Sequence, residues 1–229
     1  MILNYSEHGM NIEDTNNEIR EVHKSLKVFS NARKFIIVEN KEIVKACRES
    51  INAAHSANAS LPGAGSDQLK KSKEKAFKAA HLLKKVQKRL KTDYGKSWRQ
   101  DLNEFLFDSE QEVVEAFTLM NILNERGTTR ELSFKIKDSS YETSKAKVKV
   151  SDRAYIFGLL DCIGELKRVV LDLQNRQDLD TAKKMFEQMY NLFTKLEVFT
   201  EYSNSISELK RKIDVARYVV NETRKLFQK

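Results

Sequence analysis

Turn-forming residues are almost absent from this chain. Its 229 residues include one proline and seven glycines, so few positions favour a tight turn. Folds made of many short strands need such turns at regular intervals, and this excludes a sandwich or a barrel. The chain is nevertheless long enough to bury a sizeable core. We therefore predict an all-α fold made of long helices.

Apolar residues recur at helical spacing in long segments. Between Tyr155 and Leu173 they return at steps of four and three residues without a break. Gly95 is expected to stop one helix, and Ser151 to cap another. The expected helices cover about residues 15–58, 67–94, 97–126, 151–175, 180–199 and 205–228. The first is longer than about 25 residues, which is typical of an extended bundle. The pattern predicts a single long-helix domain over 1–229, with six to seven helices.

The helical pattern breaks between residues 127 and 150. Apolar and polar residues alternate over Leu132–Ile136 and again at Val148 and Val150, with lysines at most of the polar positions. We expect an insertion here, either a short, lysine-edged strand pair or an irregular loop.

Hydropathy and cysteine content indicate the cellular environment. Mean hydropathy is −0.58, and no apolar run approaches the roughly 20 residues that a membrane span needs. Residues 1–10 lack the apolar core of a secretory signal. The two cysteines, Cys47 and Cys162, cannot form a disulfide framework and fall on helical seams, which favours core positions. We expect a cytoplasmic protein without membrane contact.

Positive charge is concentrated in residues 69–99. This segment has twelve Lys and Arg residues and two acidic ones, a net charge of +10, so the rest of the chain carries −2 of the total +8. Such a density attracts nucleic-acid phosphates regardless of base sequence. The alternative is a solvated lysine-rich helix face, which is common. Because few acidic residues balance the charge, we favour contact with nucleic acid.

Four acidic residues lie on apolar stripes of their helices. Glu112 and Glu115 are three residues apart, and Asp161 and Glu165 are four apart, so each pair shares one helix face. Unpaired carboxylates are costly to bury, and four oxygen ligands without clustered His or Cys suit Mg²⁺ or Mn²⁺. Neither pair has the Glu-x-x-His spacing of a di-iron bundle. Spacing alone leaves ordinary salt bridges at a bundle edge as an equal alternative.

Four stretches of the chain resemble the translin/Trax family. Residues 111–116 (QEVVEA) and 155–168 (YIFGLLDCIGELKR) are similar to the two acidic motifs of the Trax branch. Residues 209–224 resemble the final helix of the family, and residues 18–24 (EIREVHK) resemble the start of its first helix. The resemblance spans nearly the whole chain and is strongest in its second half. It implies an α-α superhelix whose subunits form hollow octamers that enclose nucleic acid.

The acidic motifs distinguish the two branches of this family. Trax members are metal-dependent endoribonucleases with Glu-x-x-Glu in the first motif, whereas translin members have apolar residues there and bind RNA and single-stranded DNA. This sequence retains all four acidic positions of the Trax set. The resemblance therefore implies a Mg²⁺ (or Mn²⁺) site that is also the catalytic site, formed by Glu112, Glu115, Asp161 and Glu165.

The resemblance also implies nucleic-acid contacts and partners. The expected contacts are Arg20 and Lys24 in the first helix, and Lys96 and Arg99 in the stretch 94–99. RNA, duplex or single-stranded, is the expected ligand, and single-stranded DNA is a second one. We expect a homo-oligomer of eight subunits, and a translin-like partner subunit is a further expectation. The sequence thus predicts a Mg²⁺-dependent endoribonuclease that cleaves RNA inside a shell, with a non-catalytic translin-like binding protein as the alternative.

Overall fold

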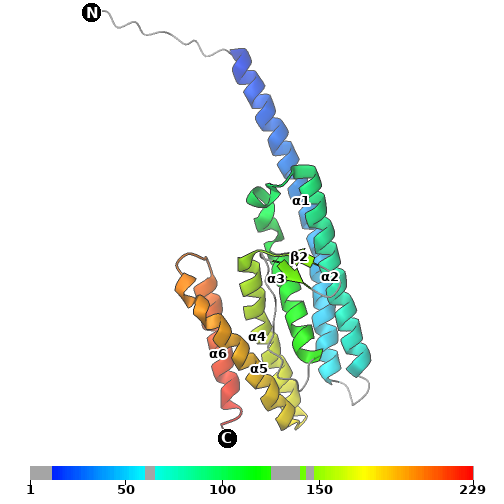
Figure 1. Ribbon diagram of the computed structural model, residues 1–229, viewed down its shortest axis with the longest axis vertical. Helices are drawn as coiled ribbons and strands as arrows, with labels where there is room; N and C mark the ends of the chain where they lie inside the picture. Colours follow the sequence, from blue (N-terminus) through cyan, green and yellow to red (C-terminus); the bar gives the residue numbers. More distant parts are fainter. Residues whose placement is uncertain (1–11, 60–64, 125–139, 143–146, 229) are drawn as a thin grey trace, which may run out of the picture.

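The computed structural model describes residues 12–59, 65–124, 140–142 and 147–228, and long helices account for most of them (Figure 1). The helices are α1 (Ile12–Ala59), α2 (Gly65–Tyr94), α3 (Trp98–Asn124), α4 (Asp152–Asn175), α5 (Leu179–Glu197) and α6 (Leu209–Lys225). A short 3-10 helix, η1 (Val198–Tyr202), joins the last two. The predicted all-α, long-helix bundle is confirmed.

Each helix buries one apolar stripe against its neighbours. α1 packs on α2 and α3, α3 packs on α4, and α4 packs on α5 and α6. Leu83, Phe117 and Leu166 are fully buried members of this continuous core. Because the opposite faces are polar, no helix in the described segments is both long and apolar enough to cross a membrane.

The helix ends follow local signals where the sequence supplies them. Gly95 has a φ of 76° directly after α2, the left-handed conformation with which glycine commonly ends a helix. The Ser151 side chain caps α4 by accepting a hydrogen bond from the Ala154 amide, as expected. The last helix begins at Leu209 and not at residue 205, because η1, turns and a left-handed Glu208 (φ 68°) intervene.

A small hairpin precedes α4. Strands β1 (Ser140–Glu142) and β2 (Lys147–Lys149) pair antiparallel, with Tyr141 opposite Val148. Val148 and Val150 are buried where this hairpin packs on α2. A strand pair therefore forms within the expected insertion, and β2 falls on the predicted alternation near Val148, but β1 lies at Ser140–Glu142, where the alternation predicted no strand. The predicted alternation at residues 132–136 lies outside the described residues.

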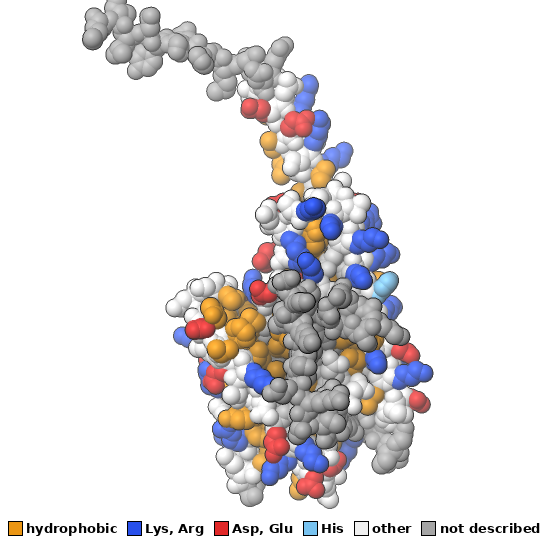
Figure 2. Space-filling view, in the orientation of Figure 1, with side chains coloured by type: hydrophobic (Ala, Val, Ile, Leu, Met, Phe, Trp, Pro, Cys, Tyr) orange, Lys and Arg blue, Asp and Glu red, His pale blue; other side chains and the backbone are white. Residues whose placement is uncertain are grey.

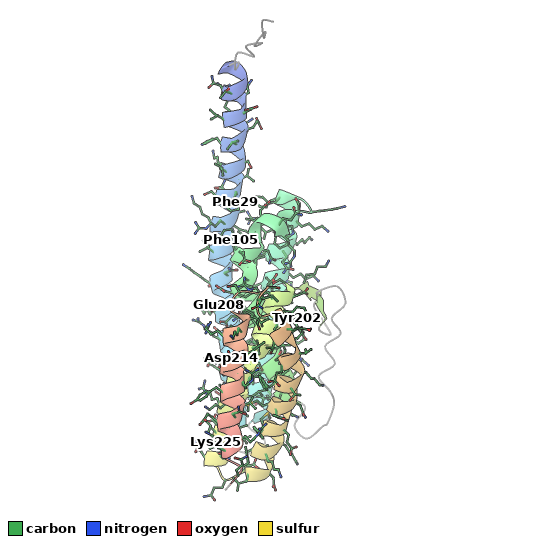
Figure 3. All side chains as sticks on the ribbon, turned by 90° about the vertical axis from the view of Figure 1, so that its left-hand side faces the viewer. Phe29, Phe105, Tyr202, Glu208, Asp214 and Lys225 are labelled. Carbon is green, nitrogen blue, oxygen red and sulfur yellow. The ribbon has the colours of Figure 1, made fainter. Side chains whose placement is uncertain are left out.

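The N-terminal part of α1 stands clear of the bundle (Figure 1). Residues 16–31 are all exposed, including Ile19, Val22 and Leu26, whose side chains are 57–61% exposed. Their spacing of three and four residues is that of a stripe that normally packs against a partner. Phe29 lies beside Phe105 of α3, with ring centroids 5.8 Å apart, where α1 leaves the bundle (Figure 3). The described segments of the chain therefore leave the stripe from Ile19 to Leu26 exposed.

Candidate metal centre and nucleic-acid interface

A close contact between α3 and α4 sets the two acidic pairs against each other. A methyl group added to Gly158 would lie 2.5 Å from the Gln111 carbonyl oxygen and 2.7 Å from the Val114 Cβ, so only glycine fits this crossing. Gln111 directly precedes Glu112, and Asp161 follows Gly158 by three residues. The absence of a side chain at this position thus brings the α3 carboxylates close to the α4 carboxylates.

Mutual repulsion among these carboxylates is strongest at Glu115. Burial first, and then the negative charges of Asp161, Glu112 and Glu165, raise the pKa of Glu115 to about 8, while Lys212 opposes this. Three carboxylates therefore act on a fourth from both helices. A group of acids that repel each other in this way is stabilised by a bound cation.

Glu112 occupies a similar environment beside a basic residue of α1. Burial raises the pKa of Glu112, the guanidinium of Arg48 lowers it, and the Asp161 carboxylate raises it further. Arg48 is exposed, so its charge lies at the solvent side of this carboxylate. Neither Glu112 nor Glu115 forms an ion pair within 4 Å with any described cation.

Asp161 lies on α4, and side chains of α3 and α6 form hydrogen bonds with its carboxylate. The Nζ of Lys212 lies 2.5 Å from Oδ1 and 2.6 Å from Oδ2 of Asp161, and it also lies 5.2 Å from the Phe157 ring centroid. The side-chain amide of Gln111 donates a further hydrogen bond to Oδ2. Both oxygens of Asp161 are thus hydrogen-bonded within the chain.

A histidine that the sequence pattern did not single out holds the other α4 carboxylate. His55 of α1 is 5% exposed, and its Nε2 forms a hydrogen bond with Oε2 of Glu165. This hydrogen bond lowers the pKa of Glu165, against the effect of burial. Because the two residues are 110 positions apart, no local motif connects them. His55 therefore belongs to the candidate site as a residue that orients Glu165.

The chemistry of these side chains fits a hard divalent cation. Carboxylate oxygens are the preferred ligands of Mg²⁺ and Mn²⁺, and α3 and α4 carry four carboxylates close enough for three of them to raise the pKa of the fourth, Glu115. Among the described residues, no three His, Cys, Asp or Glu side chains form a group already arranged to hold a metal ion. The salt-bridge alternative accounts for Asp161 and Glu165, but not for Glu112 and Glu115. The metal site stays a prediction.

The two predicted core cysteines flank this cluster. Cys47 of α1 and Cys162 of α4 are fully buried free thiols, as expected for core positions. Burial raises both thiol pKa values well above the ordinary range, and the charge of Glu115 raises both further. A thiol in this state is a poor nucleophile, so both cysteines act as buried core residues near the acidic cluster.

Basic side chains gather along the edge of the molecule that α2 forms (Figure 2). Only Lys75 and Arg89 of this helix pair with a described acid, with Glu49 and Asp93 respectively. Eight other lysines of α2 are exposed and pair with no described carboxylate: Lys70, Lys71, Lys73, Lys78, Lys84, Lys85, Lys88 and Lys91. The charge predicted from the sequence is therefore largely unneutralised.

Three of the four predicted RNA contacts are exposed at one end of the bundle. Arg20 and Lys24 lie on the projecting part of α1, where Lys24 pairs with Glu21 at 2.5 Å. Lys96 is exposed and lies two residues after the end of α2. The hydroxyl of Tyr94, the last residue of α2, donates a hydrogen bond to the Val28 carbonyl oxygen of α1. Glu112 lies 14 residues into α3, about 21 Å along its axis from Trp98. These contacts are thus distant from the carboxylates of the same chain.

The fourth predicted contact, Arg99, has partners inside the chain. Its Nη2 lies 3.1 Å from Oε1 of Glu110 and 2.9 Å from the Lys149 carbonyl oxygen, and Glu110 is fully buried. The other oxygen of Glu110 accepts a hydrogen bond from the Ser151 amide at 2.7 Å. Arg99 therefore ties α3 to the hairpin and to the start of α4, a structural role that its position in a basic segment did not indicate.

The fold and site define a class: long-helix proteins with an acidic cluster between two central helices and a basic outer edge. The family model described as "Translin family" matches residues 31–226 of this chain. The chain therefore belongs to the Translin family. The resemblance seen in the acidic motifs and in the final helix is confirmed at the level of the family.

Solved structures share this fold. The chain is similar to AfC3PO, with a TM-score of 0.68 and 25% identity over 91% of this chain and 94% of that one. For AfC3PO in its complex with duplex RNA, the TM-score is 0.69, with 24% identity over 91% and 93%. For apo-NeC3PO, the values are 0.60 and 16%, over 94% and 95%. The translin-type fold is thus confirmed.

One curated protein is a clear sequence relative. It is the uncharacterized protein MJ0175 of Methanocaldococcus jannaschii, 28% identical in an alignment of 173 residues that covers 68% of this chain and 71% of that protein. Because that relative is itself uncharacterised, it supports kinship and says nothing of activity.

Proposed function

We propose that this chain is a Trax-like, Mg²⁺-dependent endoribonuclease that encloses RNA in an oligomeric shell. The proposal rests chiefly on one observation, the close crossing of α3 and α4 at Gly158, across which the charges of Asp161 and Glu165 act on Glu115. Membership of the Translin family supports it, and so does the similarity to a protein that was solved with duplex RNA. A divalent cation at such a site would activate water and stabilise negative charge on the scissile phosphate.

Residues of this chain supply the rest of the proposed chemistry. Glu112 and Glu115 provide the negative charge that retains the cation, and His55 fixes the orientation of Glu165. Arg48 and Arg168 are exposed, and their charges act on Glu112 and Glu165 respectively. We infer that these two arginines bind the phosphates on either side of the cleaved bond, a role for which guanidinium geometry is well suited.

A non-catalytic RNA- or single-stranded-DNA-binding protein is the second candidate. The observation that favours it is that Asp161 and Glu165 already have partners within the chain. The two candidates differ in a test with labelled RNA and purified protein. The nuclease converts RNA to shorter products in Mg²⁺ but leaves it bound and intact in Ca²⁺, which is larger and coordinates more loosely. The binding protein leaves RNA intact in both.

RNA affinity is expected to depend on the exposed lysines of α2. Replacing Lys84 and Lys88 together by Ala should weaken the binding of unrelated RNAs about equally, because phosphate contacts carry no base information. Loss of two phosphate contacts should also reduce the slope of log affinity against log salt by about 1.4–1.8. Fluorescence anisotropy over a salt series measures both effects.

The control for this pair removes the same charge elsewhere. Lys183 and Lys184 are exposed on α5, and replacing both by Ala should leave the RNA affinity and salt slope nearly unchanged. An equal loss in the two double variants would show that net charge alone, and not the α2 edge, determines binding.

A second copy of this chain is expected to cover the apolar stripe of α1. Replacing Leu26 by Asp puts a charge on that stripe and should reduce the assembly, expected to be eight subunits, to smaller species. Asn17→Asp, on the opposite side of the same helix, is the matched control and should leave the mass unchanged. Light scattering at micromolar concentration measures the mass. A monomeric wild-type protein would contradict the proposed shell.

A further inference from the structure

Lys212 brings a positive charge from α6 into the acidic cluster. Its neighbours on α6, Leu209 and Ile213, are buried, so the helix is fixed on both sides of the lysine. The Lys212 side chain is 17% exposed, and its ammonium contacts both oxygens of Asp161 at 2.5 and 2.6 Å. The same charge lowers the pKa of Glu115, so it acts on both acidic helices.

The Lys212 ammonium binds the same Asp161 oxygens that a metal ion would coordinate. Both oxygens of Asp161 accept hydrogen bonds from Lys212, and Oδ2 also accepts one from Gln111, so a divalent cation that binds these oxygens must compete with the ammonium. Lysine suits a temporary partner, because its charge is a compact point on a flexible four-carbon stem. The ammonium also lies 5.2 Å from the Phe157 ring centroid, so the face of that ring offers the charge a second contact besides Asp161.

We propose that Lys212 is a resident counter-cation of the carboxylate cluster, which a divalent cation must displace from Asp161 in order to bind. The inference rests on the proposed function, because it takes Asp161 to be a metal ligand. In the metal-free chain, Lys212 neutralises one of the converging carboxylates and keeps α4 and α6 together. Exchange of one ammonium for one divalent ion involves no covalent step, and Lys212 keeps its proton throughout.

A fixed structural ion pair is the competing interpretation. In that case Lys212 would stay on Asp161 with or without metal, and its removal would destabilise the protein at every metal concentration. The displacement model predicts a different result, since removing Lys212 also removes a competitor. The two interpretations therefore differ in metal affinity and not only in stability.

Mn²⁺ binding to the full-length protein separates them, with the free ion measured by electron paramagnetic resonance. Lys212→Met should bind Mn²⁺ about tenfold more tightly than wild type, which corresponds to about 1.4 kcal/mol. In EDTA the variant should have a lower thermal midpoint, and Mn²⁺ should raise that midpoint more than it does in wild type. Lys212→Gln, which retains a hydrogen-bond donor, should show the same direction with a smaller change.

The control is Lys210→Met on the same helix. Lys210 is exposed and pairs with no described carboxylate, so this variant should bind Mn²⁺ as wild type does. Unchanged or weaker Mn²⁺ binding in both Lys212 variants would overturn the inference, whether or not wild type cleaves RNA. Tighter binding without any RNA cleavage would instead support the inference and contradict the proposed nuclease. Absence of Mn²⁺ binding in every variant would overturn both.

Discussion

Replacing Glu115 by Gln is expected to abolish most RNA cleavage while RNA binding and assembly size stay nearly unchanged. Gln keeps the shape of Glu but loses the charge that retains a divalent cation. The loss should exceed about 100-fold, since changes to residues that only orient metal ligands already cost about 10–100-fold. Glu112→Gln, Glu165→Gln and Asp161→Asn should behave in the same way. Cleavage rates and anisotropy on one labelled RNA measure both properties.

Thermal stability distinguishes this outcome from a purely structural role. Burial and three neighbouring carboxylates raise the pKa of Glu115, so a neutral Gln should leave the metal-free midpoint unchanged or raise it. Glu104→Gln on the same helix is the control, because Glu104 is 76% exposed and pairs only loosely with Arg153 at 3.6 Å. If Glu115→Gln lowers stability and leaves cleavage intact, this carboxylate has only a structural role and the catalytic assignment is wrong.

A second large effect, on both stability and metal binding, is expected when Gly158 is replaced at the crossing of α3 and α4. Gly158→Ala places a methyl group 2.5 Å from a backbone oxygen of α3, so the two helices must move apart. We expect a loss of about 1–3 kcal/mol in the free energy of unfolding, as for other overpacked sites. The acidic pairs separate with the helices, so Mn²⁺ affinity and RNA cleavage should fall as well. Urea unfolding and Mn²⁺ titration measure the two effects.

Gly164 provides a matched control on the same helix. A methyl group there meets no atom within 4 Å, and alanine favours helix by up to about 1 kcal/mol over glycine. Gly164→Ala should therefore be neutral or stabilising, with metal binding unchanged. Equal effects of the two substitutions would mean that the close crossing at Gly158 does not position the site.

Local patterns were sufficient to predict most of the fold. The unbroken apolar seam in α4, the Ser151 cap and the glycine after α2 each act within a few residues, and each appears in the structure where expected. The start of α6 was wrong by four residues, because apolar spacing continues through the turns before Leu209. Spacing reports which faces are apolar, but it does not report whether the backbone is α-helical at each position.

The residues that contact the candidate site could be identified only from the tertiary structure. Glu112, Glu115, Asp161 and Glu165 were visible as acids on apolar stripes, but His55 and Lys212 reach them from α1 and α6. Composition also could not separate the lysines of the α2 edge from Arg99, which pairs inward with a buried glutamate. These contacts join residues 11 to 110 positions apart, beyond any short motif.

The exposed part of α1 illustrates a different limit. The sequence predicted one continuous helix over this region, and α1 is continuous. The sequence could not show that Ile19, Val22 and Leu26 are left exposed by the rest of the described structure, because an apolar stripe has the same spacing whichever chain it packs against.

The central claim is that the acids of α3 and α4 cleave RNA with the help of a divalent ion. The most direct measurement is the cleavage of one end-labelled RNA by wild-type protein and by Glu112→Gln, each stripped with EDTA and then supplied with Mg²⁺. We expect product only from wild-type protein in Mg²⁺, although both proteins bind the RNA. Equal cleavage by Glu112→Gln, or cleavage that persists in EDTA, would contradict the claim.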